Sequence, residues 1–270
     1  MTRRPFPMAR RPIHATLLGA ALVIAACGGG PTVPELTDPT EILTATANLA
    51  AAARSVHVDL TADGELSLDL TGTGTATPVQ LTDTTAAADL DITGGDARLT
   101  FAIPGVLGLR GELIAVDGTG FVKSTLTGAR YRTVALGSTA PGDSSASMLN
   151  GLTDFLQRPG LDPVKGADVA CGGGTCYTVT IDLTAEELAA LGIDTSQIQI
   201  PSGLPIPIPS LAGASVNLTV RVEKDTTRLA GLTAVVKTGD TGEATVTVTF
   251  SKWNDAITVT APPADQVDAG

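Results

Sequence analysis

The stretch 53-ARSVHVDLTADGELSLDL-70 contains the pattern that decides the fold of this chain. Apolar and polar residues alternate from Ser55 to Leu60, and again from Glu65 to Leu70. A period of two places the apolar side chains on one face of a β-strand. Asp63-Gly64, between the two runs, is typical of a tight hairpin turn. The stretch therefore predicts two antiparallel strands, each with one apolar face.

The same alternation recurs along the rest of the chain. Gly94-Gly95 and Asp117-Gly118 mark further turns. We expect an α+β fold in which a curved antiparallel sheet of about ten strands forms a half-barrel, with a few helices covering its concave side. The expected strands lie in 87–95, 97–103, 108–126, 129–136, 215–225, 228–239 and 243–255.

Three segments have a helical pattern instead. Asp38 and Pro39 are typical of a helix start, and Ile42, Leu49, Ala50 and Ala53 share one face of a helix from 39 to about 54. A second helix is expected within 143–160, where Met148, Leu149, Leu152, Phe155 and Leu156 repeat at helical spacing. Thr184 and Glu187 form a capping box for a short third helix, which Gly192 would end.

The first 26 residues have the pattern of an export signal. Four arginines precede an apolar run from Ile13 to Ala26, which is shorter than the roughly 20 residues that span a bilayer. Ile24-Ala25-Ala26-Cys27 resembles the lipobox of bacterial lipoproteins, which implies acylation of Cys27 and cleavage before it. The alternative is an ordinary signal peptide with an incidental cysteine. Thr2–Phe6 also resembles a twin-arginine signal, so the export route stays open.

The remaining chain is acidic and long enough for one domain. After removal of residues 1–26 it has 28 acidic and 13 basic residues, which argues against nucleic-acid binding. We expect a lipidated tether at 27–38, one domain at 39–262 and a loose tail at 263–270.

Cys171 and Cys176 flank a glycine-rich turn between strand-like residues. In an exported protein such a pair is most simply a disulfide that closes a hairpin. A free redox pair and a metal site are the alternatives, although no further cysteine or histidine cluster could complete a metal site.

Catalytic patterns are missing from the mature sequence. His57 is its one histidine, and it lies on the polar side of a strand. The nucleophile motifs G-x-S-x-G and S-x-x-K and a Walker loop are absent. We therefore expect no enzyme activity, no metal and no cofactor.

The apolar strand faces are the remaining functional signal. A wide curved sheet with few covering helices must close on itself or enclose a cavity. A proline-rich loop at 200–213 is either a packed connector or the lip of that cavity. From alternation and helical phase, the expected lining residues are Leu90, Ile92, Leu99, Phe101, Ile103, Val134, Leu136, Met148, Leu152 and Phe155.

Several segments between about 40 and 262 resemble the LppX/LprG family of actinobacterial envelope lipoproteins, which is itself similar to LolA and LolB. They are AARSVHVDLTADGEL (52–66), GELIAVDGTGFVKS (111–124), ARYRTVAL (129–136) and FSKWNDAITVTAP (250–262). The resemblance implies a half-barrel with an apolar cavity for the acyl chains of lipids or glycolipids, and a role in carrying or presenting them. It brings no catalytic residues.

The predicted protein is thus exported and anchored to the cell membrane through acylated Cys27, facing the periplasm or outer envelope. Its expected partners are a lipid or glycolipid and the lipoprotein-processing enzymes, and we expect a monomer. The alternative is a structural or interaction lipoprotein with a filled core and no ligand, which the low aromatic content of 3% leaves open.

Overall fold

The computed structural model describes residues 35–68, 77–135, 141–190, 214–238 and 242–268. Cys27, Leu136 and the proline-rich loop at 200–213 lie outside the described residues, as does the side chain of Met148. Gly192, the expected end of the third helix, is also outside them.

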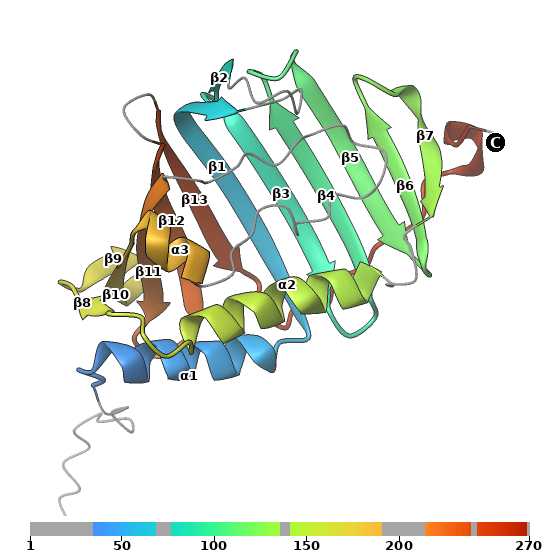
Figure 1. Cartoon of the computed structure of the whole chain (residues 1–270). Helices are drawn as coiled ribbons and strands as arrows, with labels where there is room; N and C mark the ends of the chain where they lie inside the picture. The colour runs from blue at the N-terminus through green and yellow to red at the C-terminus, as the bar shows by residue number, and fades with distance from the viewer. Residues whose placement is uncertain (1–34, 69–76, 136–140, 191–213, 239–241, 269–270) are drawn as a thin grey trace, which may run out of the picture. The chain divides into compact units, whose positions relative to one another are not determined.

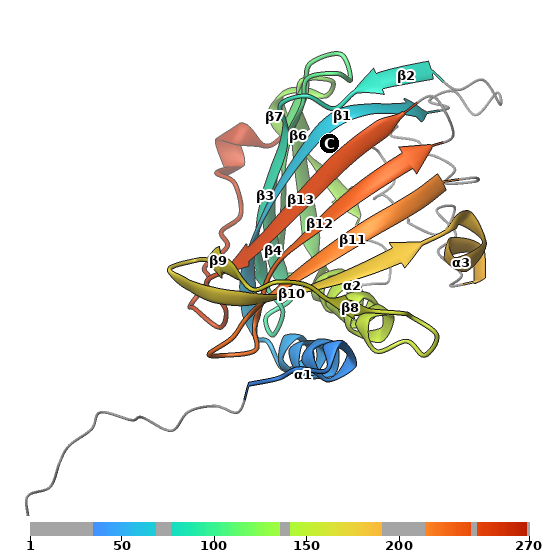
Figure 2. The same cartoon turned by 90° about the vertical axis from the view of Figure 1, so that its left-hand side faces the viewer.

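In these described residues, thirteen strands form one open antiparallel sheet, and three α-helices accompany it. Figures 1 and 2 show this arrangement. The helices are α1 (Pro39–Ala51), α2 (Pro141–Leu156) and α3 (Ala185–Ala190). The strands are β1 (Ser55–Leu68), β2 (Thr77–Gln80), β3 (Thr84–Asp91), β4 (Asp96–Ile103), β5 (Leu109–Val116), β6 (Thr119–Ser124), β7 (Gly128–Ala135), β8 (Val164–Lys165), β9 (Val169–Cys171), β10 (Gly174–Leu183), β11 (Ala214–Glu223), β12 (Leu229–Thr238) and β13 (Glu243–Ser251). The predicted α+β class and curved antiparallel sheet are confirmed.

β1 lies at the centre of the sheet, between β3 and β13. The strand order is β7-β6-β5-β4-β3-β1-β13-β12-β11-β10-β8, with β2 paired to β1 and β9 to β10. The last of the described strands thus pairs with the first, and the remaining main strands extend as hairpins to either side. This arrangement makes one continuous surface from strands far apart in the sequence.

The hairpin predicted at Asp63-Gly64 is wrong, because β1 runs through both residues. Their pairing with β13 is unbroken, Asp63 opposite Thr245 and Gly64 opposite Ala244. Gly64 has a φ of +103°, and a Cβ there would lie 2.3 Å from the carbonyl oxygen of Glu243. The glycine thus permits a bend where β1 changes partner from β3 to β2, which explains why its sequence looks like a turn. The turns predicted at Gly94-Gly95 and Asp117-Gly118 are confirmed.

Helix α1 begins where the sequence predicts and ends earlier. The Asp38 carboxylate accepts hydrogen bonds from the backbone amides of Thr40 (2.7 Å) and Glu41 (3.2 Å), which satisfies amides that a helix start leaves free. Its buried face includes Leu43 and not Leu49, whose expected burial is therefore wrong. The buried positions from Ile42 to Ala50 cover an arc of about 140° around the axis, and Leu49 lies about 20° beyond the edge of that arc at Ile42.

Helices α1 and α2 lie against each other across one end of the sheet (Figures 1 and 2). Their apolar residues form the main core with strands β10 to β12. The largest fully buried members are Ile42, Leu43, Tyr177, Ile181 and Leu229. The core therefore fills the α1 end of the concave side. The capping box of α3 is confirmed, since the Thr184 amide donates to the Glu187 carboxylate at 2.7 Å.

The segment after residue 262, expected to be loose, is docked on β7. The Asp268 amide donates to the Tyr131 carbonyl at 2.8 Å, and the Asp268 carboxylate lies 3.0 Å from Arg130. Val259 and Val267 pack on a second apolar cluster of Ile114, Val116 and Tyr131 on the outer face. Residues between 259 and 268 therefore cover these side chains.

The predicted disulfide is confirmed between Cys171 and Cys176, whose Cα atoms are 5.8 Å apart. It joins β9 to β10 beside a turn in which Gly172 and Gly173 both have positive φ. Cys176 is fully buried. The bond thus fixes a short hairpin at the end of β10.

Candidate functional site

Two neighbouring rows of side chains, one on each face of the sheet, differ in chemistry. On the outer face, one row across adjacent strands consists of threonines in register: Thr180, Thr219, Thr233, Thr247, Thr61 and Thr85. The neighbouring row on the concave face is apolar through most of its length: Val179, Val220, Leu232, Val248, Leu60, Ala86 and Phe101. We call this second set the apolar row.

Burial changes along the apolar row. Val179 and Val220, next to the core, have an exposure of 0%. From Leu232 onward, every member is only half-buried. Side chains beside the row, including Leu99, Ile103, Leu113 and Val246, are half-buried as well. The apolar surface therefore continues beyond the packed core toward β4 and β5.

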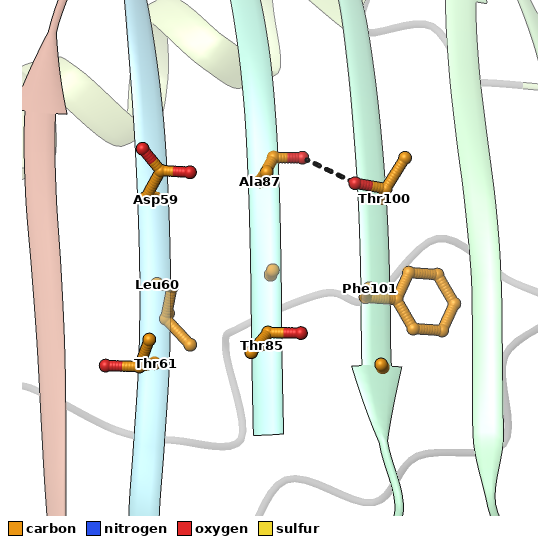
Figure 3. Close-up of a pocket in the computed structure, with 9 residues that line it drawn as sticks. Asp59, Leu60, Thr61, Thr85, Ala87, Thr100 and Phe101 are labelled. Carbon is orange, nitrogen blue, oxygen red and sulfur yellow. Dashed lines mark hydrogen bonds between the residues drawn. The ribbon is translucent and has the colours of Figure 1, made fainter. Parts of the chain in front are cut away.

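Phe101 gives this surface its shape. A Cβ on Gly111, its partner on β5, would lie 2.5 Å from Cζ of Phe101. The end of the ring therefore contacts Gly111. Figure 3 shows Phe101 extending sideways from β4 toward the next strand. An aromatic ring over a strand glycine covers backbone that a glycine leaves bare. The result is a smooth apolar floor on β4 and β5.

The sequence-predicted lining residues separate into two groups. Leu90 and Ile92 pack on the cluster of Ala50, Val56 and Leu149, and Leu152 and Phe155 pack on the main core. Leu99, Phe101, Ile103 and Val134 are half-buried on the strands that continue the surface. Leu136 and the side chain of Met148 lie outside the described residues. The predicted lining residues are thus of two kinds, those that contact the core and those on the surface of the sheet.

The predicted lining did not include several residues of this surface: Leu60, Ala86, Leu113, Leu232, Val246 and Val248. Each has the strand phase of residues that were recognised, since Leu60 lies two and four residues beyond Val58 and Val56. The pairing of β13 with β1 brings residues near 60 and 248 together, and the strand patterns in the sequence do not indicate this pairing.

Two of the shallow grooves on the outer face lie over strands β1 to β7. One, of about 310 Å³, lies above β3 and is lined on that face by Asp59, Thr61, Thr85, Ala87 and Thr100 (Figure 3). Phe101 also borders it, although alternation directs its side chain to the concave face. The other, of about 560 Å³, lies over β4 to β7 beside Arg110, Glu112 and Lys123.

Glu112 is the centre of a charged network beside the second groove. Tyr131 donates a hydrogen bond to it at 2.6 Å, Arg98 lies 2.6 Å away and Lys123 3.6 Å away. Burial opposes ionisation of Glu112, but these hydrogen bonds and positive charges outweigh it and lower the carboxyl pKa below its ordinary value. The network stabilises the outer face of β4 to β7.

His57 lies on the outer face, as its sequence position predicts. Its Nδ1 is 2.6 Å from the Asp89 carboxylate and its Nε2 is 3.2 Å from that of Asp59. Among the residues that the structure describes, no group of three or more His, Cys, Asp and Glu side chains could hold a metal ion.

LprF from Mycobacterium bovis superposes with a TM-score of 0.53 at 18% identity, over 84% of this chain and 98% of LprF. The chain has the fold of LprF. The Mycobacterium tuberculosis lipoprotein LppX aligns at 18% identity over 83% of this chain and all of LppX, with a TM-score of 0.48. No protein-family model and no curated protein matches the sequence.

The expected resemblance to the LppX/LprG type is therefore confirmed at the level of the fold. Within the described residues, no helix has both the length and the apolar character needed to cross a membrane.

Proposed function

We propose that this protein is a membrane-anchored envelope lipoprotein that binds acyl chains of lipids or glycolipids on the concave face of its sheet and carries or presents them. The observation that carries the proposal is the apolar row, which continues past the packed core as half-buried Leu232, Val248, Leu60, Ala86 and Phe101. The anchor is acylated Cys27, and the protein acts by binding and not by catalysis.

The chemistry of the row suits an alkyl chain. Its side chains are aliphatic or aromatic, and the polar threonines of the same strands face the other way. Transfer of one CH₂ from water to such a surface stabilises the complex by about 0.8 kcal/mol, so one long chain gains on the order of 10 kcal/mol before entropy losses. Affinity on this scale needs no polar motif.

The likeness to LprF supports the fold on which the proposal depends. The packed core of α1, α2 and β10 to β12 supports the alternative, a scaffold whose interior is filled. The two functions differ in one property, which is whether lipid enters beside Phe101.

Native mass spectrometry of the mature protein, purified from a lipid-rich bacterium without denaturant, tests the proposal. We expect adducts that extract into organic solvent. Phe101→Asp places a charge on the apolar floor and should abolish them. Thr100→Asp is the matched control, because it puts the same charge one residue away on the exposed outer face, and it should keep them.

Both variants must first show the cooperative unfolding of the parent protein. A folded Phe101→Asp variant with unchanged adducts would exclude the concave face as the binding surface. An adduct-free parent that takes up no lipid on incubation would favour the filled scaffold.

A further inference from the structure

Two leucines are exposed at the tips of neighbouring hairpins. Leu107, in the β4–β5 turn, has an exposure of 89%, and Leu126, in the β6–β7 turn, has one of 51%. Both turns lie at the end of the sheet opposite α1 and α2 (Figure 1). Single exposed leucines are common on protein surfaces, so the pair needs further observations before it indicates a function.

Backbone hydrogen bonds hold both tips in place. In the β4–β5 turn, the Gly108 amide donates to the Pro104 carbonyl at 3.0 Å and the Leu109 amide to Val106 at 2.8 Å. A Cβ on Gly105 would lie 1.8 Å from the Gln80 carbonyl oxygen, so this turn packs directly on the end of β2. Leu107 has a φ of 52°, which is unfavourable for a side chain of its size. The fold therefore presents Leu107 to solvent in spite of the strain.

The second tip is held equally well and is joined to the first. Ser124 and Thr127 exchange hydrogen bonds around Leu126, the Ser124 amide donating to the Thr127 hydroxyl at 2.9 Å. The Thr125 amide donates to the Arg110 carbonyl at 2.9 Å, and the Arg110 amide to the Thr125 hydroxyl at 3.2 Å. Arg110 follows the first tip directly. The two turns are thus linked, and their leucines are exposed together.

The strands that carry the two tips have more basic than acidic residues, although four of the basic ones are ion-paired with Glu112 or Asp268: Arg98, Lys123, Arg130 and Arg132. Residues 96–135 contain five basic and three acidic residues, whereas 27–270 as a whole contains 13 basic and 28 acidic ones. The Arg110 side chain is exposed and has no ion-pair partner among the described residues. It borders the 560 Å³ groove together with Lys123 and Thr125. An unpaired arginine beside exposed leucines matches an anionic lipid surface, where the headgroup phosphates lie above the acyl region.

We propose that Leu107 and Leu126 dip into a lipid bilayer while Arg110 binds a headgroup phosphate, so that this end of the sheet docks on anionic membranes. This inference rests on the proposed function, because docking on a membrane would serve the uptake or delivery of lipid. Ile103, half-buried on the concave face, lies one residue before this turn. Docking here would bring an acyl chain from the bilayer to the end of the apolar surface.

Tryptophan reporters in the full-length protein test the docking directly. Leu107→Trp and Leu126→Trp place an indole at each tip, and Val164→Trp, on β8 and 61% exposed in the parent, is the matched control. The probe is a vesicle of phosphatidylcholine and phosphatidylglycerol with brominated acyl chains, which quench a fluorophore only on contact. We expect quenching at 107 and 126 beyond that of the parent Trp253, and none at 164.

A second substitution measures the strength of docking. In the Leu126→Trp background, Leu107→Asp should lower the ratio of membrane-docked to free protein by about tenfold, because one leucine side chain no longer enters the acyl region of the bilayer. Leu49→Asp, at an exposed leucine on α1, should leave it unchanged. Equal quenching of all three reporters would overturn the proposal and indicate membrane attachment through the anchor alone. Quenching of none would also overturn it and indicate a protein partner for the tips.

The two proposals fail in different ways. Lipid adducts without quenching at the tips would overturn membrane docking and leave lipid binding intact. Quenching at the tips without adducts would overturn lipid binding and leave docking intact.

Discussion

Gly111→Ala is the substitution whose effect the structure defines most closely. The new Cβ would lie 2.5 Å from Cζ of Phe101 and 2.7 Å from the carbonyl oxygen of Lys123. Carbon atoms in good contact are about 3.5–4.0 Å apart, so both neighbours must move. The Phe101 ring can rotate away from Gly111, but the Lys123 carbonyl belongs to the β5–β6 ladder.

Overpacking of this kind lowers the free energy of unfolding by about 1–3 kcal/mol. Phe101→Ala alone should cost about 2 kcal/mol, since the ring is half-buried. In the double variant the methyl group meets no ring, so only the carbonyl clash remains. We expect the double variant to be about 1 kcal/mol more stable than the sum of the single effects.

Urea denaturation of the four proteins measures this coupling. Gly151→Ala serves as the control, because Gly151 lies on α2 with no atom within 4 Å of its would-be Cβ. There the substitution should stabilise by about 0.5–1 kcal/mol through helix propensity. A Gly111→Ala variant as stable as the parent, or a double variant with purely additive effects, would refute the reasoning about how Phe101 covers Gly111.

Two further predictions concern the outer face and the hairpin. The pKa of Glu112 is lowered on folding. Its stabilising effect is therefore present above its unfolded pKa of about 4.3 and is lost as the pH falls through the folded value. Glu112→Gln should lower the free energy of unfolding near pH 7 by about 1 kcal/mol, and urea denaturation at a series of pH values should show a smaller loss of stability on the acid side, which we call the acid limb. A variant with the parent's full acid limb would contradict this. Replacing both cysteines of the Cys171–Cys176 bond by alanine should cost about 2 kcal/mol, from the entropy of a short closed loop, and an unshifted melting temperature would count against that role.

Local patterns in the sequence predicted most of the elements correctly, since caps and turns depend on neighbouring residues. The Asp38 cap, the Thr184–Glu187 capping box and the turn at Asp117-Gly118 were all recognisable. The exception, Asp63-Gly64, shows the limit of such patterns. A glycine that allows a bend within a strand and one that allows a hairpin have the same requirement for positive φ.

Long-range pairing was harder to predict, and the candidate site depends on it. Phe101 was recognised from its strand phase, yet its position over Gly111 follows from the register of β4 with β5. The pairing of β1 with β13 left no local sign in either strand. Docking of the tail on Tyr131 was missed for the same reason, because Val259 and Val267 are isolated apolar residues whose partners lie over a hundred positions earlier.

The beginning of the described chain is tied down by side chains as well as by α1. Lys224 Nζ lies 2.7 Å from both the Glu35 and Asp168 carboxylates, and the Leu36 amide donates to the Tyr177 hydroxyl at 2.9 Å. These carboxylates raise the pKa of Lys224, so it stays charged at any physiological pH.

The contacts of Glu35 and Leu36 determine how the molecule resists a pulling force. Tension applied through the N-terminal residues would reach the Lys224 ion pairs and the Tyr177 hydroxyl before it reached the first turn of α1. The load would therefore pass sideways into the β10–β11 end of the sheet. A helix loaded only after such contacts break can remain wound while the chain ahead of it is stretched.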